Sequence, residues 1–177
     1  MDETIFLPPS AEGLVIEGHA CLFGVVDLGR DMVLPGAFAE SLARGAAVRM
    51  LYQHDPAEPI GVWTDIREDA RGLYVRGRLS PAVARARECA ALVREGALDG
   101  LSIGFKAVEA RTDPKTRVRR LSRIDLWEVS IVTFPMQPGA RLAPVEPALA
   151  PGFAPSLPPA LALAGATRRL RASLAAR

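Results

Sequence analysis

Three polar side chains of different chemistry lie within or at the ends of strand-like apolar runs of this chain. They are an imidazole, a hydroxyl and a carboxylate: His54, Ser102 and Glu128. These groups are the three parts of a serine-type acyl-transfer site. The chain has only two histidines, so few other bases are available to such a site. The residues therefore predict hydrolysis of a peptide or an ester.

His54 follows the run 48–53, and Asp55-Pro56 is expected to break that strand and turn the chain away. A histidine at the end of a strand can reach a cleft while its backbone is held rigid, as a general base requires. The alternative is a hydrogen-bonded surface histidine. The other histidine, His19, lies inside a strand-like segment with its apolar neighbours on the opposite face, which favours an outward-facing structural role.

Ser102 directly follows the turn residues Asp99-Gly100 and lies two residues before a glycine. Small residues around a serine leave room for a substrate backbone to approach. Ser130 competes as the nucleophile, but its neighbours are ordinary strand residues and offer no such opening. Ser41 falls inside an expected helix, and Ser80 is explained as a helix N-cap.

Glu128 is the more unusual residue, because alternation places it on one face of an apolar strand. A carboxylate there must find a partner, since an unpaired buried charge is costly. An imidazole Nδ1–H is one such partner and would fix the histidine tautomer. Two alternatives stay open: Asp125 could serve in place of Glu128, or Glu128 could form a salt bridge to a nearby arginine. The arginines considered are Arg119, Arg120 and Arg123.

Apolar periodicity predicts six or seven strands and two helices, and therefore a mixed α+β or barrel-like fold. The expected strands span residues 14–23, 48–53, 60–67, 72–79, 101–111 and 118–134. The expected helices span 37–44 and 81–95, and a glycine-punctuated loop is expected over 24–36. The second helix should begin at Pro81 and bury a stripe of residues at helical spacing. That stripe consists of Val83, Ala86, Ala90 and Val93.

Composition divides the chain into a folded domain and three other segments. Residues 1–13 are expected to form a loose arm and 14–142 the domain. Residues 143–160 contain six of the fifteen prolines, which is typical of a flexible linker. Residues 161–177 are basic without an acidic residue, and are either an amphipathic helix formed on contact with a partner or a solvated tail.

The bulk properties exclude several classes of function. A net charge of +2 is too small to indicate nucleic acid or an anionic membrane as the main partner. The only cysteines, Cys21 and Cys89, lie near no second sulfur or histidine pair, which argues against a zinc site. No export signal or membrane span is visible, so a cytoplasmic protein is expected. No metal or organic cofactor is implied.

Taken in order, these residues resemble the prohead proteases of tailed bacteriophages, the enzymes that mature phage capsids. The resemblance runs from about residue 16 to residue 142. It rests on several short segments in the same order, none decisive alone. These are Gly18-His19-Ala20, Phe23-Gly24, Leu34-Pro35-Gly36-Ala37-Phe38, Gln53-His54-Asp55, Pro59-Ile60-Gly61, Gly72-Leu73, Leu101-Ser102-Ile103-Gly104-Phe105, Glu128-Val129-Ser130-Ile131-Val132 and Pro135.

The resemblance implies a fold and a catalytic order similar to those of the herpesvirus maturation proteases, a β-barrel wrapped by helices. It implies a histidine, then a serine, then a third polar residue, which match His54, Ser102 and Glu128. The herpesvirus enzymes use a second histidine as the third member, but this chain has none beyond position 54. The family's usual aromatic residue near position 19 is His19 here, and the oxyanion donors do not transfer from sequence.

The resemblance also implies substrates and partners. These are scaffold segments of the major capsid protein inside an immature shell, other copies of the chain, and the chain itself, with self-cleavage expected within residues 143–165. The particle is either a phage or a phage-like element such as a gene transfer agent. Two rival functions remain: a non-catalytic capsid assembly factor, and a small β-barrel that binds a cation at Asp27 and Asp31. That acidic pair lacks the spacing of a calcium loop.

Overall fold

The computed structural model describes residues 13–45 and 47–145. These residues form eight strands in one sheet and two helices. The strands are β1 (Val15–Leu22), β2 (Asp31–Val33), β3 (Arg49–Tyr52), β4 (Asp55–Glu68), β5 (Gly72–Leu79), β6 (Gly100–Thr112), β7 (Arg119–Val132) and β8 (Leu142–Pro144). The helices are α1 (Ala39–Ala43) and α2 (Ala84–Arg94). The mainly β, α+β fold expected from the sequence is confirmed.

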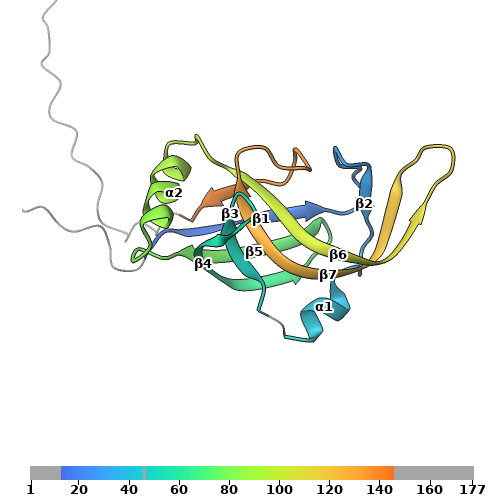
Figure 1. Cartoon of the computed structure of the whole chain (residues 1–177), viewed down its shortest axis with the longest axis horizontal. Helices are drawn as coiled ribbons and strands as arrows, with labels where there is room; N and C mark the ends of the chain where they lie inside the picture. Colours follow the sequence, from blue (N-terminus) through green and yellow to red (C-terminus); the bar gives the residue numbers. More distant parts are fainter. Residues whose placement is uncertain (1–12, 46, 146–177) are drawn as a thin grey trace, which may run out of the picture. The chain divides into compact units, whose positions relative to one another are not determined.

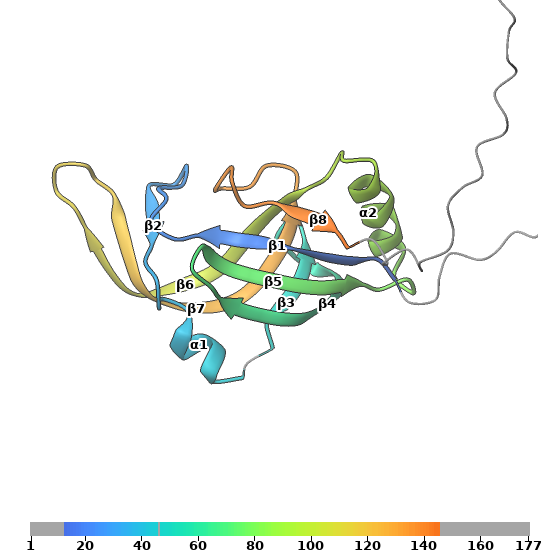
Figure 2. The same ribbon diagram turned by 180° about the vertical axis from the view of Figure 1, so that it is seen from behind.

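The sheet is curled into a half-barrel, as Figures 1 and 2 show. The strand order is β2-β7-β3-β4-β5-β1-β8, and β6 pairs with the other edge of β7. The β2–β7 and β3–β7 pairs are parallel and the others are antiparallel. A single bridge between Gly100 and Arg141 joins β6 to the segment before β8. The start of β6 therefore lies beside the segment that leads into β8, which covers part of these strand edges against pairing with other chains.

Two short strands fall where none was expected. β2 lies within the predicted loop 24–36, and β8 crosses the predicted domain boundary at residue 142. Each has three residues and is held by pairing with a distant strand, β7 for β2 and β1 for β8. Strands this short carry too little periodicity to be recognised. The predicted N-terminal arm, most of the predicted linker and the basic tail lie outside the described residues.

The hairpin of β3 and β4 corrects the expectation that Asp55-Pro56 ends the strand region. Instead β4 begins at Asp55, which pairs with Tyr52 across a two-residue turn. The register then shifts, so that Leu51 pairs with Pro59 and Pro56 falls in the irregular part of the pairing. Proline lacks a backbone N–H, and a bulge is one of the places where a strand tolerates it.

Helix α2 confirms three of the four residues of the expected buried stripe but begins later than predicted, so that the fourth, Val83, precedes the helix and is half-buried. Ala86, Ala90 and Val93 are buried, with Cys89 between them. The N-cap is Val83 and makes no side-chain capping bond, so the prediction of Ser80 as N-cap is wrong. The reason is that the N–H of Ser80 donates to Ile60 O, which holds Ser80 beside the sheet. Neither described helix is long and apolar enough to span a membrane.

Strands β6 and β7 form one long antiparallel ladder with two different surroundings. Near Ser102 and Ser130, β3 pairs with the second edge of β7. Farther along, the ladder projects as a hairpin whose β7 strand is flanked by β2 at residues 119–121, next to the loop 113–118. We call residues 108–123 the distal arm. Its position is plain in Figures 1 and 2.

Candidate active site

The turn between β3 and β4 fixes the position of His54. Gln53 and His54 have φ values of 52° and 61°, so both central residues lie in the left-handed region, as a type I′ hairpin turn requires. Neither is a glycine, and such backbone conformations persist only where surrounding contacts hold them. Here the N–H of Gln53 donates to Ile131 O at 3.0 Å, and its Nε2 donates to Thr133 Oγ1 at 2.7 Å. The turn is therefore tied to β7.

The imidazole of His54 is paired with Glu128. Nδ1 lies 2.6 Å from Glu128 Oε1, and the Glu128 side chain is 12% exposed while that of His54 is 44% exposed. A carboxylate oxygen accepts, so Nδ1 carries the proton and Nε2 is the basic nitrogen of the neutral ring. The hydrogen bond to Glu128 raises the pKa of His54, partial burial opposes this, and the Glu128 charge adds to the increase.

Ser130 connects the turn to the carboxylate. Its side chain is fully buried, its Oγ donates to Glu128 Oε2 at 2.7 Å, and it accepts the His54 N–H at 3.0 Å. The sequence presented Ser130 as a competing nucleophile. In the structure its hydroxyl proton is engaged by Glu128, and Ser130 contacts both the carboxylate and the His54 turn. No sequence signal distinguished this role from that of an ordinary strand serine.

Gly104 provides the space that Glu128 occupies. Ser102 pairs with Ser130 and Gly104 with Glu128 across the ladder, so all four lie on one face of the sheet. A Cβ on Gly104 would lie 2.7 Å from Glu128 Cδ, far inside contact distance. From the sequence, the space around Ser102 was expected to admit a substrate backbone. At Gly104, that room is filled by the carboxylate.

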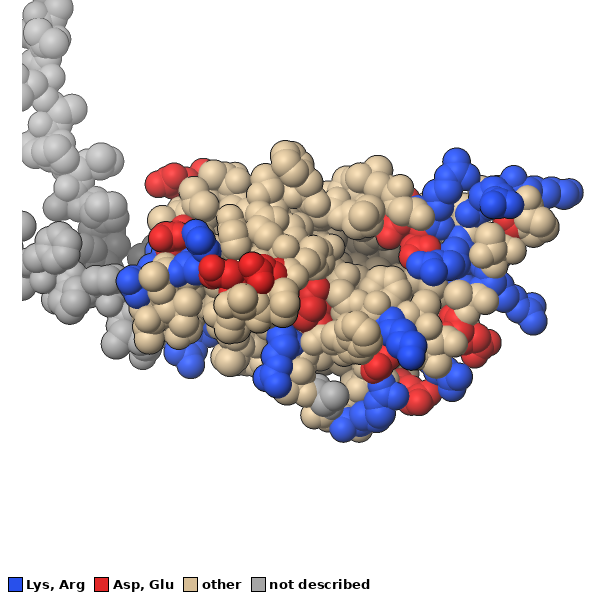
Figure 3. All heavy atoms as spheres, in the orientation of Figure 1, with Lys and Arg blue, Asp and Glu red and all other residues tan. Residues whose placement is uncertain are grey.

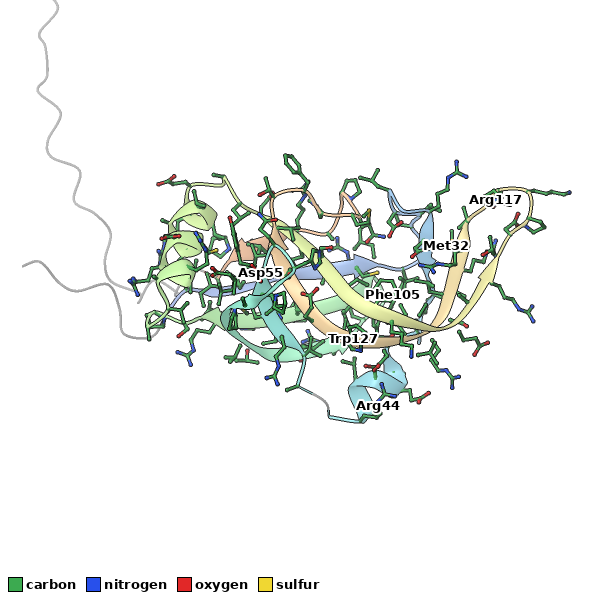
Figure 4. The ribbon with its side chains drawn as sticks, viewed as in Figure 1. Met32, Arg44, Asp55, Phe105, Arg117 and Trp127 are labelled. Carbon is green, nitrogen blue, oxygen red and sulfur yellow. The ribbon has the colours of Figure 1, made fainter. Side chains whose placement is uncertain are left out.

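Ser102 and His54 line the same pocket, whose volume is about 350 Å³. Leu101, Ile103 and Phe105 supply part of its apolar wall. Ser102 is 8% exposed, and among the described residues no hydrogen bond joins its hydroxyl to the imidazole. The structure thus brings His54 and Glu128 into contact and places Ser102 beside them in one pocket. Figure 4 shows the region between the labelled Asp55, which begins β4, and Phe105 on β6.

A second potential nucleophile, Cys21, also lines this pocket. Burial, together with the nearby charges of Asp27 and Glu68, raises the pKa of its thiol to about 12. The thiol therefore stays protonated at neutral pH, and it is the thiolate that is nucleophilic. Burial likewise raises the pKa of Cys89, on α2, to about 11. Neither cysteine has the environment of a catalytic thiol.

The alternative carboxylate, Asp125, has other partners. It accepts hydrogen bonds from Arg44 and from Trp127 Nε1, the latter at 3.0 Å. Arg44 and Trp127 are both labelled in Figure 4, next to α1 and β7. Asp125 therefore does not orient His54 in this structure.

Two of the arginines considered as partners for Glu128 also pair elsewhere. Arg119 makes two hydrogen bonds to the carboxylate of Asp31, at 2.7 and 2.5 Å, and Arg123 lies 3.3 Å from Glu40. Asp31 also donates its N–H to Asp27 Oδ1 at 2.8 Å. The carboxylates of the supposed cation loop are thus engaged by protein groups. No group of three or more metal-ligating side chains occurs among residues 13–45 and 47–145.

The remaining candidates have structural contacts. His19 Nε2 lies 2.8 Å from Asp69 Oδ2, and its ring meets Tyr74 edge to face at 5.8 Å between centroids. Ser41 is buried, and its Oγ accepts the N–H of Leu126 at 2.9 Å. Both side chains link neighbouring segments away from the pocket.

Comparison with known proteins gives both a family and relatives. Residues 6–151 match the family model described as caudovirus prohead serine protease. The prohead protease of Enterobacteria phage HK97 is 36% identical over 138 residues, which cover 75% of this chain and 60% of that protein. The prohead protease of Escherichia phage T5 is 30% identical over 86 residues, covering 49% of this chain and 40% of that protein. The chain thus spans less than two thirds of the length of either relative.

Two solved structures share the fold. The bacteriophage T4 capsid assembly protease matches with a TM-score of 0.58 and 18% identity, over 68% of this chain and 81% of that chain. The KSHV protease in complex with a hexapeptide phosphonate inhibitor matches with a TM-score of 0.53 and 13% identity, over 77% of this chain and 66% of that chain. At these identities the likeness establishes the fold alone, and it confirms the expected similarity to herpesvirus proteases. The family match covers most of the residues, from before β1 to beyond β8, so this chain belongs to the caudovirus prohead serine protease family.

Proposed function

We propose that this chain is a serine endopeptidase that cleaves capsid protein inside an immature phage or phage-like capsid. The observation that carries the proposal is that the bonded unit of His54, Glu128 and Ser130 opens onto the pocket that Ser102 lines. Membership of a peptidase family supports the hydrolytic chemistry. The names of the relatives in phages HK97 and T5 support the assignment to proheads.

The first half of the reaction is acylation of Ser102. His54 Nε2 accepts the proton of Ser102 Oγ while that oxygen attacks the carbonyl carbon of the scissile peptide bond. The resulting imidazolium returns the proton to the departing amine, which leaves an ester between Ser102 and the acyl part of the substrate. Substrate binding is expected to bring the hydroxyl and the imidazole into hydrogen-bond contact, since such contacts commonly tighten only in the complex.

The second half is hydrolysis of that ester. His54 takes a proton from water, which attacks the acyl carbon, and then returns the proton to Ser102 Oγ as the acid product leaves. Glu128 holds the proton on Nδ1 throughout and stabilises the positive charge that the ring carries twice in each cycle. Ser130 keeps the carboxylate turned toward the ring. No step uses a metal or an organic cofactor.

Co-expression with the major capsid protein of the same particle tests this proposal. The wild-type chain should shorten the capsid protein, as N-terminal sequencing of the assembled shell will reveal. Ser102→Ala should leave the capsid protein at full length, because loss of a catalytic serine lowers kcat by about a millionfold. Ser41→Ala is the matched control, since it removes a buried hydroxyl outside the pocket. A non-catalytic assembly factor would give the same shell with Ser102→Ala as with the wild type.

We also propose that the chain cleaves copies of itself within residues 143–165. This segment lies almost entirely outside the described residues, and its high proline content is typical of exposed polypeptide that proteases cut. Intact-mass measurement of assembled particles should find a shortened chain with the wild-type serine and the full mass with Ser102→Ala. Finding only the full-length wild-type chain would contradict self-cleavage.

A further inference from the structure

The distal arm exposes side chains on most of its surface. Residues 108–112 of β6 are all exposed, as are Arg119 and Arg120 of β7, whereas Leu121 is buried at the base. The loop is closed by the N–H of Asp113, which donates to Val118 O at 2.9 Å. Figure 4 shows Arg117 at the tip, where Arg30 Nη1 donates to the carbonyl oxygen of the neighbouring Thr116 at 2.9 Å. Besides its own pairing, the arm is held by β2 and by Arg30, and among its residues only Leu121 is buried.

The arm carries most of the positive charge of its end of the molecule. Residues 108–123 contain two acidic residues, Glu109 and Asp113. They contain six basic residues: Arg111, Lys115, Arg117, Arg119, Arg120 and Arg123. The segment thus has a net charge of +4, against +2 for the whole chain. Figure 3 shows basic side chains gathered at the end of the molecule where Figure 1 places the arm.

Four of these cations form no ion pair with a carboxylate of the described residues, although the charge of Arg120 contributes to lowering the pKa of the Asp113 carboxyl. Arg119 and Arg123 are paired with Asp31 and Glu40 outside the arm. No carboxylate among the described residues lies within ion-pair distance of the others: Arg111, Lys115, Arg117 and Arg120. The carboxylate of Asp113 is engaged in the loop, where it accepts the N–H groups of Lys115 and Thr116 at 2.8 Å each. The tip therefore keeps a surplus of positive charge.

One pair of these cations is placed unfavourably for the fold. Arg111 lies directly opposite Arg120 in the antiparallel register, so both side chains project from the same face. Like charges in directly opposite positions destabilise a strand pair. An arrangement that opposes folding at an exposed position is explained if an external anion neutralises it. The binding partner should therefore be negatively charged.

We propose that the distal arm binds an acidic segment of the polypeptide substrate and thereby leads the substrate to Ser102. This inference rests on the proposed peptidase function. Arg119, next to the tip loop of the arm, lines the same pocket as Ser102, so the arm and the pocket adjoin. Arg111 is nine positions from Ser102 on β6, or about 30 Å at the rise of an extended strand. An extended peptide would span this distance with a similar number of residues.

Fluorescence anisotropy on the full chain tests the docking step separately from catalysis. The Ser102→Ala protein is titrated into a labelled oligoglutamate peptide, a Gly-Ser peptide of the same length and a short DNA duplex. Oligoglutamate should bind more tightly than the Gly-Ser peptide, and added salt should weaken its binding through screening. Arg111→Glu combined with Arg120→Glu should weaken oligoglutamate binding by about tenfold or more.

Two further variants make the result specific. Arg71→Glu combined with Arg94→Glu changes the net charge equally at exposed positions off the arm, and should bind as the parent does. Arg120→Glu alone puts a carboxylate opposite Arg111, which favours the arm's own pairing, yet it should still weaken binding. Unchanged binding in both arm variants, an equal loss in the control, or equal affinity for the Gly-Ser peptide would overturn the proposal. Arm-dependent binding of the duplex without binding of oligoglutamate would overturn it in favour of nucleic acid.

The catalytic proposal is tested independently by measuring hydrolysis of a short neutral peptide by the protein that retains Ser102. The arm variants should hydrolyse this peptide at the wild-type rate, because a short peptide bound at Ser102 does not reach Arg111 or Arg120. If no protein hydrolyses it while oligoglutamate binding still depends on the arm, the docking inference stands and the peptidase proposal fails. If hydrolysis is normal and the arm variants bind oligoglutamate like the parent, the docking inference alone fails.

Discussion

The two ends of the β6–β7 ladder differ in the burial and the pairing of their polar groups. At one end, Glu128 and Ser130 are largely or wholly buried, and each of their side-chain oxygens has a hydrogen-bond partner. At the other, the exposed Arg111 and Arg120 face each other, and neither forms an ion pair with a carboxylate of the described residues. Burial makes an unpaired polar group costly, whereas solvent tolerates it. The same pair of strands can therefore hold one rigid site and one charged surface.

The neighbours of β7 account for the difference. Beside Glu128 and Ser130, β3 covers the second edge of β7 and brings the His54 turn with it. In the distal arm, only β2 touches that edge, at residues 119–121. Catalytic groups need fixed positions, which surrounding strands supply. A docking surface needs mainly a field of one sign, which exposed strands can supply.

Glu128→Gln should give the largest loss among substitutions that spare the nucleophile. The amide can donate to His54 Nδ1 and so favour the tautomer with its proton on Nε2, which cannot act as the base. An equivalent change in a serine-type site costs about 10⁴-fold in kcat. Steady-state hydrolysis of a neutral peptide measures this. A variant that keeps wild-type kcat would mean that the buried end of the ladder is not coupled to catalysis.

The same variant should also shift the pH profile. Glu128 raises the pKa of His54 above its ordinary value of 6.5, and catalysis needs the neutral ring. In the wild type, kcat/KM should therefore rise with pH through a midpoint above 6.5. Without the carboxylate, the midpoint of the residual activity should move to lower pH. An unchanged or higher midpoint would show that the pH dependence of kcat/KM does not arise from titration of His54.

Gly104→Ala should have the next largest effect. The added methyl would collide with the Glu128 side chain and push its carboxylate away from His54. A displacement of about 1 Å at a catalytic group costs about 10²-fold in rate. The acid limb should move to lower pH as well, because the hydrogen bond that raises the His54 pKa is weakened. If Gly104→Ala lowers thermal stability but leaves the acid side of the pH profile unchanged, Gly104 matters for packing and not for the His54 pKa.

Ser130→Ala and Ser41→Ala form a matched pair with a smaller expected effect. Each removes a buried hydroxyl that accepts a backbone N–H, so each should lower the free energy of unfolding by about 1–3 kcal/mol. Only Ser130→Ala frees Glu128 Oε2 and loosens the His54 turn, and it should lower kcat by about tenfold. Denaturant unfolding and peptide hydrolysis measure the two quantities. Equal kcat in the two variants would show that Ser130 does not contribute to catalysis.

The smallest expected effect is at the exposed end. Arg120→Glu replaces a like-charge cross-strand pair by an opposite-charge pair and should raise the free energy of unfolding by about 0.5 kcal/mol. Peptide hydrolysis should not change. Chemical denaturation at low salt measures the gain, and high salt should reduce it. A destabilised Arg120→Glu protein would show that the arm tolerates the Arg111–Arg120 pair better than the cross-strand rule allows.

The sequence predicted the long elements because their apolar periodicity is local. β5 and the buried stripe of α2 agree closely with expectation, and Glu128 was noticed because it interrupts an apolar strand. β2 and β8 were missed because pairing with distant strands defines them. The turn at Gln53 and His54 was missed because neither residue is the glycine or asparagine that such turns favour.

The roles of Ser130 and Gly104 were beyond sequence reasoning for a related reason. A buried serine and a strand glycine are common, and their meaning here depends on the cross-strand register that sets them beside Glu128 and Ser102. The register also decides against Asp125, whose neighbours are Arg44 and Trp127. Residue types thus suggested which chemistry to expect. Only the pairing of β6, β7 and β3 identified the groups that hold it in place.

The most direct test of the proposed Ser102 nucleophile is covalent labelling with a fluorophosphonate, followed by peptide mass spectrometry. The account predicts a single adduct on Ser102, and a much slower reaction in His54→Ala, since that variant lacks the base that activates the hydroxyl. An adduct on Ser130 or Cys21, or labelling of Ser102 at the same rate without His54, would contradict it.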